Sequence, residues 1–296
     1  MKVSRASWIN LREKGMKGAF FAAASFSLLS LLLILVYLFA TAIPFLNRIG
    51  WGHFLFGVEW APLAENPTYG IFPMIVATLY LTALSTVLGG GIGLLVAIAL
   101  FRFLPRRIVK PIKALIDLLS GIPSVIFGLF GITFVVPFVR DYISLNGNGY
   151  GLLSSSIILS IMVLPTMASV SYDALSAVNP SYYEGALSLG STKEMATFKV
   201  VLPAAKNGIF AALVLTIGRA MGETMAVIMV LGNSPQMPTS LTQSVRTLTS
   251  NIALSATEMN GDAKLSLVAT GVVLFVFALA INLIFALIKG RRGQHV

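Results

Sequence analysis

Long apolar runs dominate this chain, and shorter polar segments separate them. Each run has at least about 20 residues, enough for a helix to span the hydrocarbon core of a bilayer. The six runs cover about residues 20–43, 70–101, 114–139, 151–170, 207–231 and 265–288. Because a strand of a membrane barrel needs only about half this length, the pattern predicts an all-α membrane protein with six transmembrane helices.

Two of the runs contain residues that change helix geometry. The second run holds Gly89, Gly90, Gly91 and Gly93, which indicate either close helix packing or a flexible point. No Gly-Lys-Ser/Thr follows these glycines, so they do not form a nucleotide-binding loop. The third run holds Gly-Ile-Pro-Ser at 121–124, and we expect a kink there.

The positive charges predict the orientation in the membrane. Of 21 Lys and Arg residues, 16 lie in 1–18, 102–113, 173–206 and 289–296, which six spans place on one side. This is the positive-inside pattern, so we expect both termini in the cytoplasm. The net charge of +10 therefore requires no nucleic-acid partner. The predicted segments are a cytoplasmic N-terminal segment (1–18), a transmembrane domain (19–289) and a cytoplasmic tail (290–296).

The composition excludes several kinds of chemistry. Only 11% of the residues are charged, against about a quarter in a soluble domain. The chain has no cysteine, which excludes disulfides and cysteine-based metal or redox sites. Its two histidines, His53 and His295, are too far apart in sequence for a local metal-binding motif.

The most unusual charge lies near the middle of the fifth run. Arg219 is 12 positions from either end, where an ionised side chain costs several kcal/mol unless it faces protein or water. Glu223 follows four positions later, on the same face of a continuous helix. The two could pair, or Arg219 could offer its planar fork to an anion while Glu223 pairs elsewhere or handles a proton. Gly218 and Gly222 form a small-residue ridge beside them, suited to close helix packing.

The cytoplasmic segment 179–206 contains more structure than a connector needs. Ser181 and Glu184, and again Ser191 and Glu194, have the spacing of a helix capping box, and Gly190 stands where a helix C-terminal glycine is expected. We predict two short helices joined by a tight turn. Some of their apolar residues can pack on the spans, and an exposed remainder would indicate a docking surface. These residues are Tyr182, Tyr183, Ala186, Leu189, Met195 and Phe198.

This segment resembles the EAA loop of ABC-importer permeases. The resemblance rests on Glu184-Gly185-Ala186, Gly190 and the Val-x-Leu-Pro sequence at 200–203, with Gly185 and Val200 as mild departures. Residues 121–131 and 218–233 are similar to the PstC family of phosphate-importer permeases within that superfamily. The likeness extends from about Gly70 to the C-terminus. The first span is a generic apolar helix and does not distinguish one family from another.

The resemblance implies a type I ABC importer permease fold in a bacterial inner membrane. It implies a companion permease (PstA-like), two ATPase subunits (PstB-like) and a phosphate-binding protein (PstS-like) that delivers from outside. ATP and Mg would be bound by the ATPase, and this chain, which has no P-loop, would hold no cofactor and catalyse no reaction. Arg219 and Glu223 would lie in the phosphate path. The residues implied to couple to the ATPase are Glu184, Gly185, Ala186, Gly190, Leu202 and Pro203.

Two alternatives remain open from the sequence. An ABC permease for sulfate or molybdate would use the same arginine chemistry, because a guanidinium group does not distinguish one tetrahedral anion from another. An ion-coupled secondary transporter is less favoured, because the sequence indicates no inverted pair of broken helices. For Asp117, near the cytoplasmic end of the third run, an interfacial carboxylate is the default expectation. The outer loop 232–264 is expected to be polar, with room for a short re-entrant helix.

Overall fold

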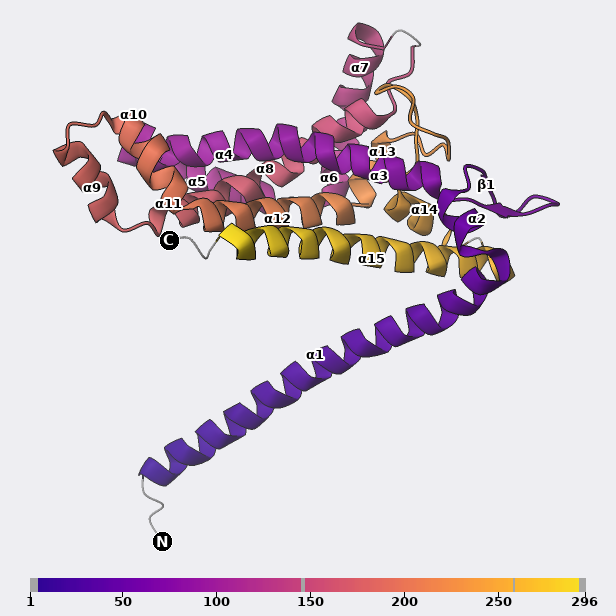
Figure 1. Ribbon diagram of the computed structural model, residues 1–296, viewed down its shortest axis with the longest axis horizontal. Helices are drawn as coiled ribbons and strands as arrows, with labels where there is room; N and C mark the ends of the chain where they lie inside the picture. The colour runs from indigo at the N-terminus through magenta and orange to yellow at the C-terminus, as the bar shows by residue number, and fades with distance from the viewer. Residues whose placement is uncertain (1–4, 145–146, 258, 293–296) are drawn as a thin grey trace.

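The computed structural model describes residues 5–144, 147–257 and 259–292, so parts of the predicted terminal segments 1–18 and 290–296 lie outside the described residues. Most of the chain is helical (Figure 1). The first half comprises α1 (Arg5–Ile49), α2 (Trp51–Phe56), β1 (Trp60–Ala61), β2 (Thr68–Tyr69), α3 (Phe72–Ser85), η1 (Thr86–Gly90), α4 (Gly91–Ile98), η2 (Ala99–Phe103), α5 (Arg106–Gly121), α6 (Ser124–Phe130), η3 (Gly131–Val135) and α7 (Val136–Tyr142). The second half comprises α8 (Leu152–Ser176), α9 (Pro180–Ser188), α10 (Lys193–Met195), η4 (Ala196–Val201), α11 (Leu202–Ala204), α12 (Lys206–Gly222), α13 (Met225–Val230), α14 (Leu248–Ser255) and α15 (Gly261–Arg292).

The predicted all-α membrane architecture is confirmed. Five helical runs among the described residues are long and apolar enough to cross a bilayer, and a sixth span is formed around α12, which bends by 70° from segment 193–204. The four elements marked η are π-helical stretches that continue the neighbouring α-helices. The N-terminal end of α1 and the C-terminal end of α15 lie toward the same end of the molecule as α9 and α10 (Figure 1).

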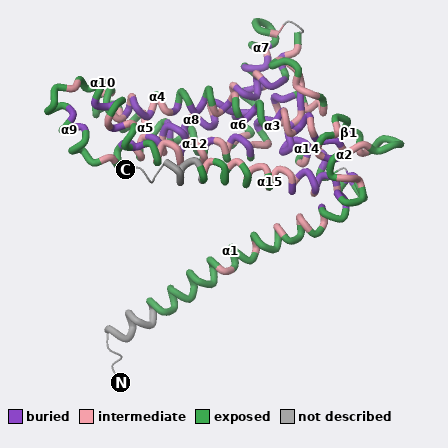
Figure 2. The backbone as a smooth tube through the Cα atoms, viewed as in Figure 1, coloured by how far each residue is buried: buried purple, intermediate pink, exposed green. Residues whose placement is uncertain are grey.

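Helix α8 forms the centre of the bundle, and more than half of its most apolar stretch is buried. Helices α3, α4, α5 and α12 pack around it. Its buried side chains Ile158, Leu159, Met162 and Val163 belong to the main apolar core. Figure 2 shows this buried interior against a largely exposed α1.

Two glycines of the second span, Gly89 and Gly93, serve close packing against α8. A side chain at Gly89 would overlap the backbone of Ser160, and a Cβ at Gly93 would lie 2.8 Å from the Leu164 carbonyl oxygen. Ser160 also donates a 3.4 Å hydrogen bond to the Ser85 carbonyl oxygen. Of the two interpretations left open by the sequence, close packing is therefore the one that the structure supports.

The third span is divided at the predicted kink. Helix α5 ends at Gly121, Ile122 is extended (ψ 129°), and α6 begins at Ser124 after Pro123. The expected span at 114–139 is thus wrong in extent. Pro123 disfavours helical geometry at the residue before it, and helix α5 therefore stops there. The continuous apolar span runs over Ser124–Tyr142 instead.

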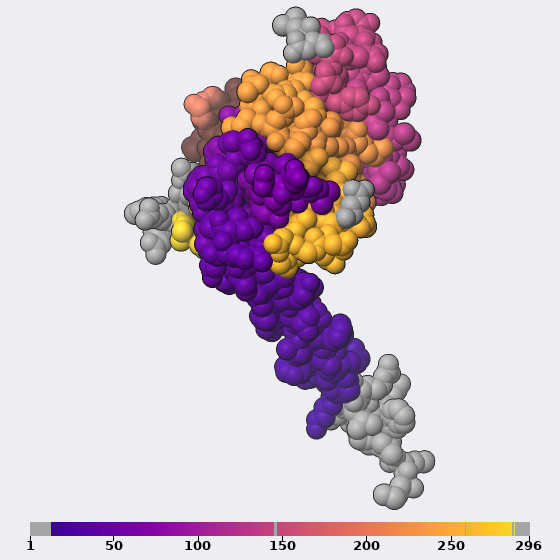
Figure 3. Space-filling model, turned by 90° about the vertical axis from the view of Figure 1, so that its right-hand side faces the viewer, coloured from indigo at the N-terminus to yellow at the C-terminus, as the bar shows by residue number. Residues whose placement is uncertain are grey.

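The end of the molecule opposite α9 and α10 joins the first and last spans. Phe45 packs in edge-to-face geometry against both Phe54 and Tyr69, within a second core cluster that includes α15. Arg48 donates to Asp262 at 2.5 Å across the same junction. From here α1 leaves the bundle and projects away from it (Figures 1 and 3).

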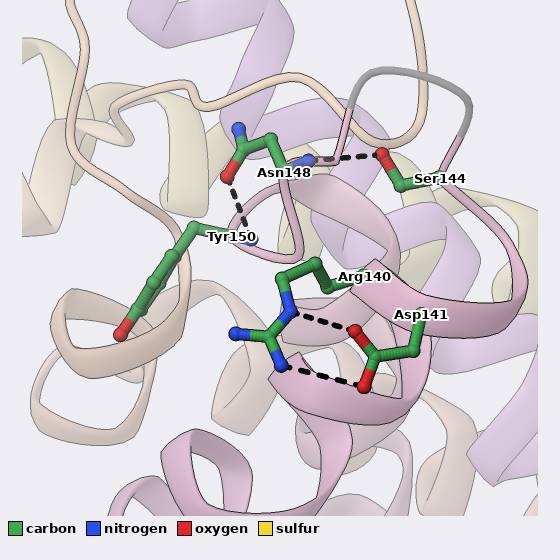
Figure 4. A network of polar contacts seen from close by, with 5 residues as sticks. All are labelled: Arg140, Asp141, Ser144, Asn148 and Tyr150. Carbon is green, nitrogen blue, oxygen red and sulfur yellow. Dashed lines mark hydrogen bonds and ion pairs between the residues drawn. The ribbon is translucent and has the colours of Figure 1, made fainter.

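The outer turn between α7 and α8 is held by local polar contacts (Figure 4). Arg140 donates to its neighbour Asp141 through Nε at 2.8 Å and Nη2 at 3.3 Å. The Asn148 amide donates to Ser144 Oγ, and Asn148 Oδ1 accepts from the Tyr150 amide. Because Arg140 is paired and exposed in this turn, its charge is compensated locally.

We predict that Gly89→Ala destabilises the protein, whereas Gly91→Ala does not. The new methyl group at position 89 meets the backbone of α8, while Gly91 is exposed and has no atom within 4 Å of its Cβ position. Overpacking of this kind costs about 1–3 kcal/mol. Thermal unfolding of the purified protein in detergent measures the difference. Equal unfolding temperatures of the two variants would contradict the close-packing interpretation.

Candidate functional site

The fifth span breaks beside its charged residues. Helix α12 ends at Gly222, Glu223 is extended (φ −70°, ψ 131°), and α13 begins at Met225. The expected continuous helix over 207–231 is therefore wrong. Arg219 and Glu223 consequently do not share one helical face.

Three hydrogen bonds satisfy polar groups that this break exposes. Glu223 Oε1 accepts from the Ala226 amide at 3.3 Å, as an N-terminal cap does. The Thr249 hydroxyl donates to the Glu223 carbonyl oxygen at 3.1 Å, and the Thr224 hydroxyl donates to the Gly222 carbonyl oxygen at 3.3 Å. The break is thus built into the fold, because an unpaired backbone group in a membrane costs several kcal/mol.

Arg219 has a neutral partner in this structure. Its Nη1 donates to Thr166 Oγ1 on α8 at 3.3 Å, and the residue is partly exposed. The ion pairs found among the described residues are Arg48–Asp262, Lys113–Asp173 and Arg140–Asp141, so Arg219 and Glu223 do not pair with each other. A guanidinium with one neutral contact retains donors for an oxyanion.

Helix α8 presents a polar face to both neighbouring helices. Thr166, Ser169 and Asp173 are spaced by three and four residues and so lie on one side of α8. Arg219 of α12 contacts Thr166, Ser169 donates to Asp117 of α5 at 3.2 Å, and Lys113 of α5 donates to Asp173 at 2.6 Å. The default expectation for Asp117, an interfacial carboxylate without a partner, therefore misses its contact with α8.

The two interrupted spans lie next to each other. Helix α6, which follows the first break, packs on α13, which follows the second. A Cβ at Gly128 would lie 3.2 Å from the Ala226 Cα, so the two helices approach at their backbones. The sequence argument against a secondary transporter concerned an inverted pair of broken helices, and the structure shows two broken spans side by side. The comparisons below decide the class instead.

The small-residue ridge beside Arg219 is open. Gly218 and Gly222 are exposed, and no atom lies within 4 Å of either Cβ position. The ridge predicted for close packing therefore meets no other helix in the described part of this chain. An apolar cavity of about 550 Å³ between η1, α4 and α12 borders Lys206 but contains neither Arg219 nor Glu223.

The segment 179–206 forms two short helices with a tight turn, as predicted. Gly190 adopts φ +85° between α9 and α10, where the Ser191 amide donates to the Ala186 carbonyl oxygen and the Gly190 amide to that of Leu187. This is a Schellman turn. The start sites differ from the expected Ser181 and Ser191. The observed caps are Asn179 and Thr192, because Pro180 fits the first helical position and both cap side chains accept backbone bonds.

Part of this segment packs on the chain and part does not. Of the implied coupling residues, Ala186 is buried and Leu202 is partly exposed, whereas four are exposed: Glu184, Gly185, Gly190 and Pro203. Among the apolar residues singled out from the sequence, Tyr183 and Ala186 are buried. The other four, which form the exposed apolar surface of the loop, are Tyr182, Leu189, Met195 and Phe198.

Two features of the site were missed in the sequence. The Arg102 guanidinium carbon lies 3.9 Å from the centre of the Tyr183 ring, a cation–π contact that fastens α9 to the second span. In the outer loop, Arg246 donates to the Asn233 carbonyl oxygen at 2.8 Å and to Asn251 Oδ1 at 3.2 Å. Burial lowers the pKa of Arg246. Neither contact has a local sequence signal, because the partners are far apart or use backbone atoms.

The outer loop also contains the short helix for which the sequence left room. Helix α14 starts at a capping box in which Thr247 and Ser250 exchange side-chain and backbone hydrogen bonds. Its residue Thr249 reaches the break at Glu223. Among the described residues, no group of three or more His, Cys, Asp or Glu side chains could hold a metal ion.

Comparison with known proteins places these features in context. The sequence profile described as "Binding-protein-dependent transport system inner membrane component" matches residues 89–294. A probable ABC transporter permease protein, YqgH of Bacillus subtilis, is 36% identical over 248 residues, 83% of this chain and 80% of that protein. The phosphate transport system permease protein PstC of Mesorhizobium japonicum is 35% identical over 279 residues, 88% of this chain and 84% of that protein.

Solved structures share the fold. A bacterial alginate ABC transporter chain superposes with a TM-score of 0.63 at 19% identity, covering 95% of this chain and 98% of that chain. A chain of the inward-facing MetNI methionine ABC transporter gives 0.61 at 19% identity, covering 75% and 95%. The expected ABC-importer permease fold is therefore confirmed.

We predict that Glu223→Ala lowers the unfolding temperature more than Glu223→Gln does. The glutamine oxygen still accepts from the Ala226 amide, whereas alanine leaves this amide without its cap. Loss of a cap costs about 1 kcal/mol, or about 2–4 °C in a chain of this size. Thermal unfolding in detergent separates the variants. Equal values would show that the carboxylate does not hold the break.

Proposed function

We propose, because the chain belongs to the family of binding-protein-dependent transport system inner membrane components, that it is the permease subunit of an ATP-driven importer of inorganic phosphate. The membrane spans and the family match support the permease role. The choice of phosphate is supported by similar proteins of several bacteria that are named phosphate transport permeases.

The observation that carries the proposal is Arg219, whose only described hydrogen-bond partner is the hydroxyl of Thr166. A guanidinium stays ionised at all physiological pH values and binds two oxygens of a tetrahedral oxyanion with parallel hydrogen bonds. Within a membrane span such a charge is costly, which makes it a functional-site candidate by default. In this proposal Arg219 contacts phosphate during passage, and Glu223 fixes the break beside it.

The path is proposed to run along an interface and not through this chain alone. Gly218 and Gly222 leave an open, small-residue surface next to Arg219, to which a companion permease (PstA-like) can approach closely. A charge on that companion is a further candidate to face Glu223. The phosphate-binding protein would deliver from outside.

Coupling to ATP hydrolysis is assigned to the cytoplasmic loop. The exposed apolar side chains of α9, α10 and η4 need a protein cover, because water surrounds this end of the molecule. Two ATPase subunits, which would bind ATP and Mg, supply such a cover through Glu184 and its neighbours. Their closure would push on α9, rearrange spans three to five and open the site outward.

The orientation follows from the same loop. The N-terminal end of α1 and the C-terminal end of α15 lie toward the same end of the molecule as this loop in Figure 1, and the positive charges of the sequence concentrate in the segments assigned to that side. We therefore place both termini in the cytoplasm of a cell with the protein in its inner membrane.

We expect ATP-dependent phosphate uptake by the assembled complex in membranes to be lost in Arg219→Ala. Arg219→Lys retains the charge but lacks the fork, so its uptake should fall at least about tenfold. Radiolabelled phosphate uptake with and without ATP measures both. Full uptake by Arg219→Ala would make the arginine structural. Sulfate or molybdate uptake in place of phosphate uptake by the wild type would reassign the substrate.

A second prediction concerns the turn of the coupling loop. Gly190→Ala forces a side chain into a left-handed backbone conformation, which costs about 1–2 kcal/mol, whereas Gly185→Ala adds a methyl group in open space of a helix. We expect Gly190→Ala to reduce phosphate uptake per ATP hydrolysed, with normal amounts of the protein in the membrane.

Gly185→Ala serves as the matched control and should couple like wild type. Glu184→Lys reverses an exposed charge in the same loop, and we expect it to reduce co-purification of the ATPase subunit. Normal coupling in Gly190→Ala together with normal ATPase binding by Glu184→Lys would remove the coupling role from this loop.

A further inference from the structure

Asp117 occupies an unusual position in the bundle. Its Oδ1 accepts from Ser169 Oγ at 3.2 Å, and four residues earlier on α5, Lys113 donates to Asp173 at 2.6 Å. The two contacts fix α5 antiparallel to α8. Ser169 lies three residues from Thr166, which is the contact of Arg219. The Cβ atoms of two such residues are about 5–6 Å apart on one helix face.

The carboxylate of Asp117 has no cationic partner among the described residues. Lys113, the nearest lysine on α5, is occupied by Asp173 and lies 4.5 Å from the centre of the Tyr172 ring. An ionised carboxylate without a counter-ion must face water or another protein surface, because an apolar environment does not solvate it. Asp117 is exposed in the single chain, which agrees with an open face.

The direction of α8 shows on which side of Arg219 the Asp117 carboxylate lies. Helix α8 ends at Ser176 and leads directly into α9, so Ser169 lies closer to the cytoplasmic loop than Thr166 does. An anion leaving Arg219 along the polar face of α8 toward that loop therefore meets Asp117 next.

We propose that Asp117 lines the cytoplasmic half of the anion path and weakens the binding of the transported anion at Arg219, so that the anion is released inward. The inference rests on the proposed function. A fixed negative charge at the neighbouring contact of α8 repels a bound anion, and two unit charges about 12 Å apart at an effective dielectric of about 20 repel by about 1.4 kcal/mol, which is about tenfold in affinity. The pair Lys113–Asp173 is neutral as a whole and adds no comparable repulsion.

The test is equilibrium binding of radiolabelled phosphate to the complete transporter in lipid nanodiscs, without nucleotide. Asp117→Asn removes the charge while its amide oxygen still accepts from Ser169. We expect about tenfold tighter phosphate binding than in wild type. Lys113→Met combined with Asp173→Asn removes the neutral pair as a whole, is the matched control, and should change binding less than twofold. Asp117→Ser, neutral and smaller, provides a second variant if the asparagine variant assembles poorly.

The role of Arg219 is tested in the same assay. Adding Arg219→Gln to Asp117→Asn should abolish the gain, because both residues act on one bound anion. The absence of any gain in the neutral Asp117 variants overturns the inference, whether or not binding to wild type is measurable. A gain that persists without Arg219 overturns it as well. Failure of the proposed function is recognised separately, as an absence of ATP-dependent phosphate uptake by wild type.

Discussion

The need to satisfy every backbone polar group inside a bilayer governs this structure, because lipid offers no hydrogen bonds. A membrane span can break only where other groups replace the lost helical bonds. At Glu223 the replacements are its own carboxylate, which caps α13, and the hydroxyl of Thr249. The loop between α13 and α15 therefore reaches the break, and Arg246 fastens that loop through Asn233 and Asn251.

The central helix determines where charge can be tolerated. Helix α8 packs most of its surface in the core, where several of its serines are buried, and Thr166, Ser169 and Asp173 lie on a less buried face. Side chains from α5 and α12 reach that face from either side, at Asp173, Ser169 and Thr166. The charged residues Lys113, Asp117, Asp173 and Arg219 thereby gather around this face of α8.

The exposed apolar surfaces of the molecule have different physical requirements. Along α1 they include Phe20, Phe26 and Leu33, in a stretch long enough to cross a bilayer, where lipid chains are an adequate solvent. On the loop at 179–206, which we propose to be cytoplasmic and therefore in water, Leu189 is 90% exposed. Only this second surface requires a protein cover to avoid a lasting cost in free energy.

The sequence by itself determined the membrane class, the six spans, the arginine within the fifth and the turn at Gly190, because these depend on run length and on the conformation of single residues. Only the tertiary structure decided the break at Glu223, where neither a proline nor a glycine stands at the extended position. It also decided the starts of α9 and α10 and the partner of Asp117. The physical reason is range: sequence periodicity reports neighbours within a helical turn, whereas Thr249 and Glu223 are 26 residues apart and Asp117 and Ser169 are 52. Such contacts exist only once the helices have packed.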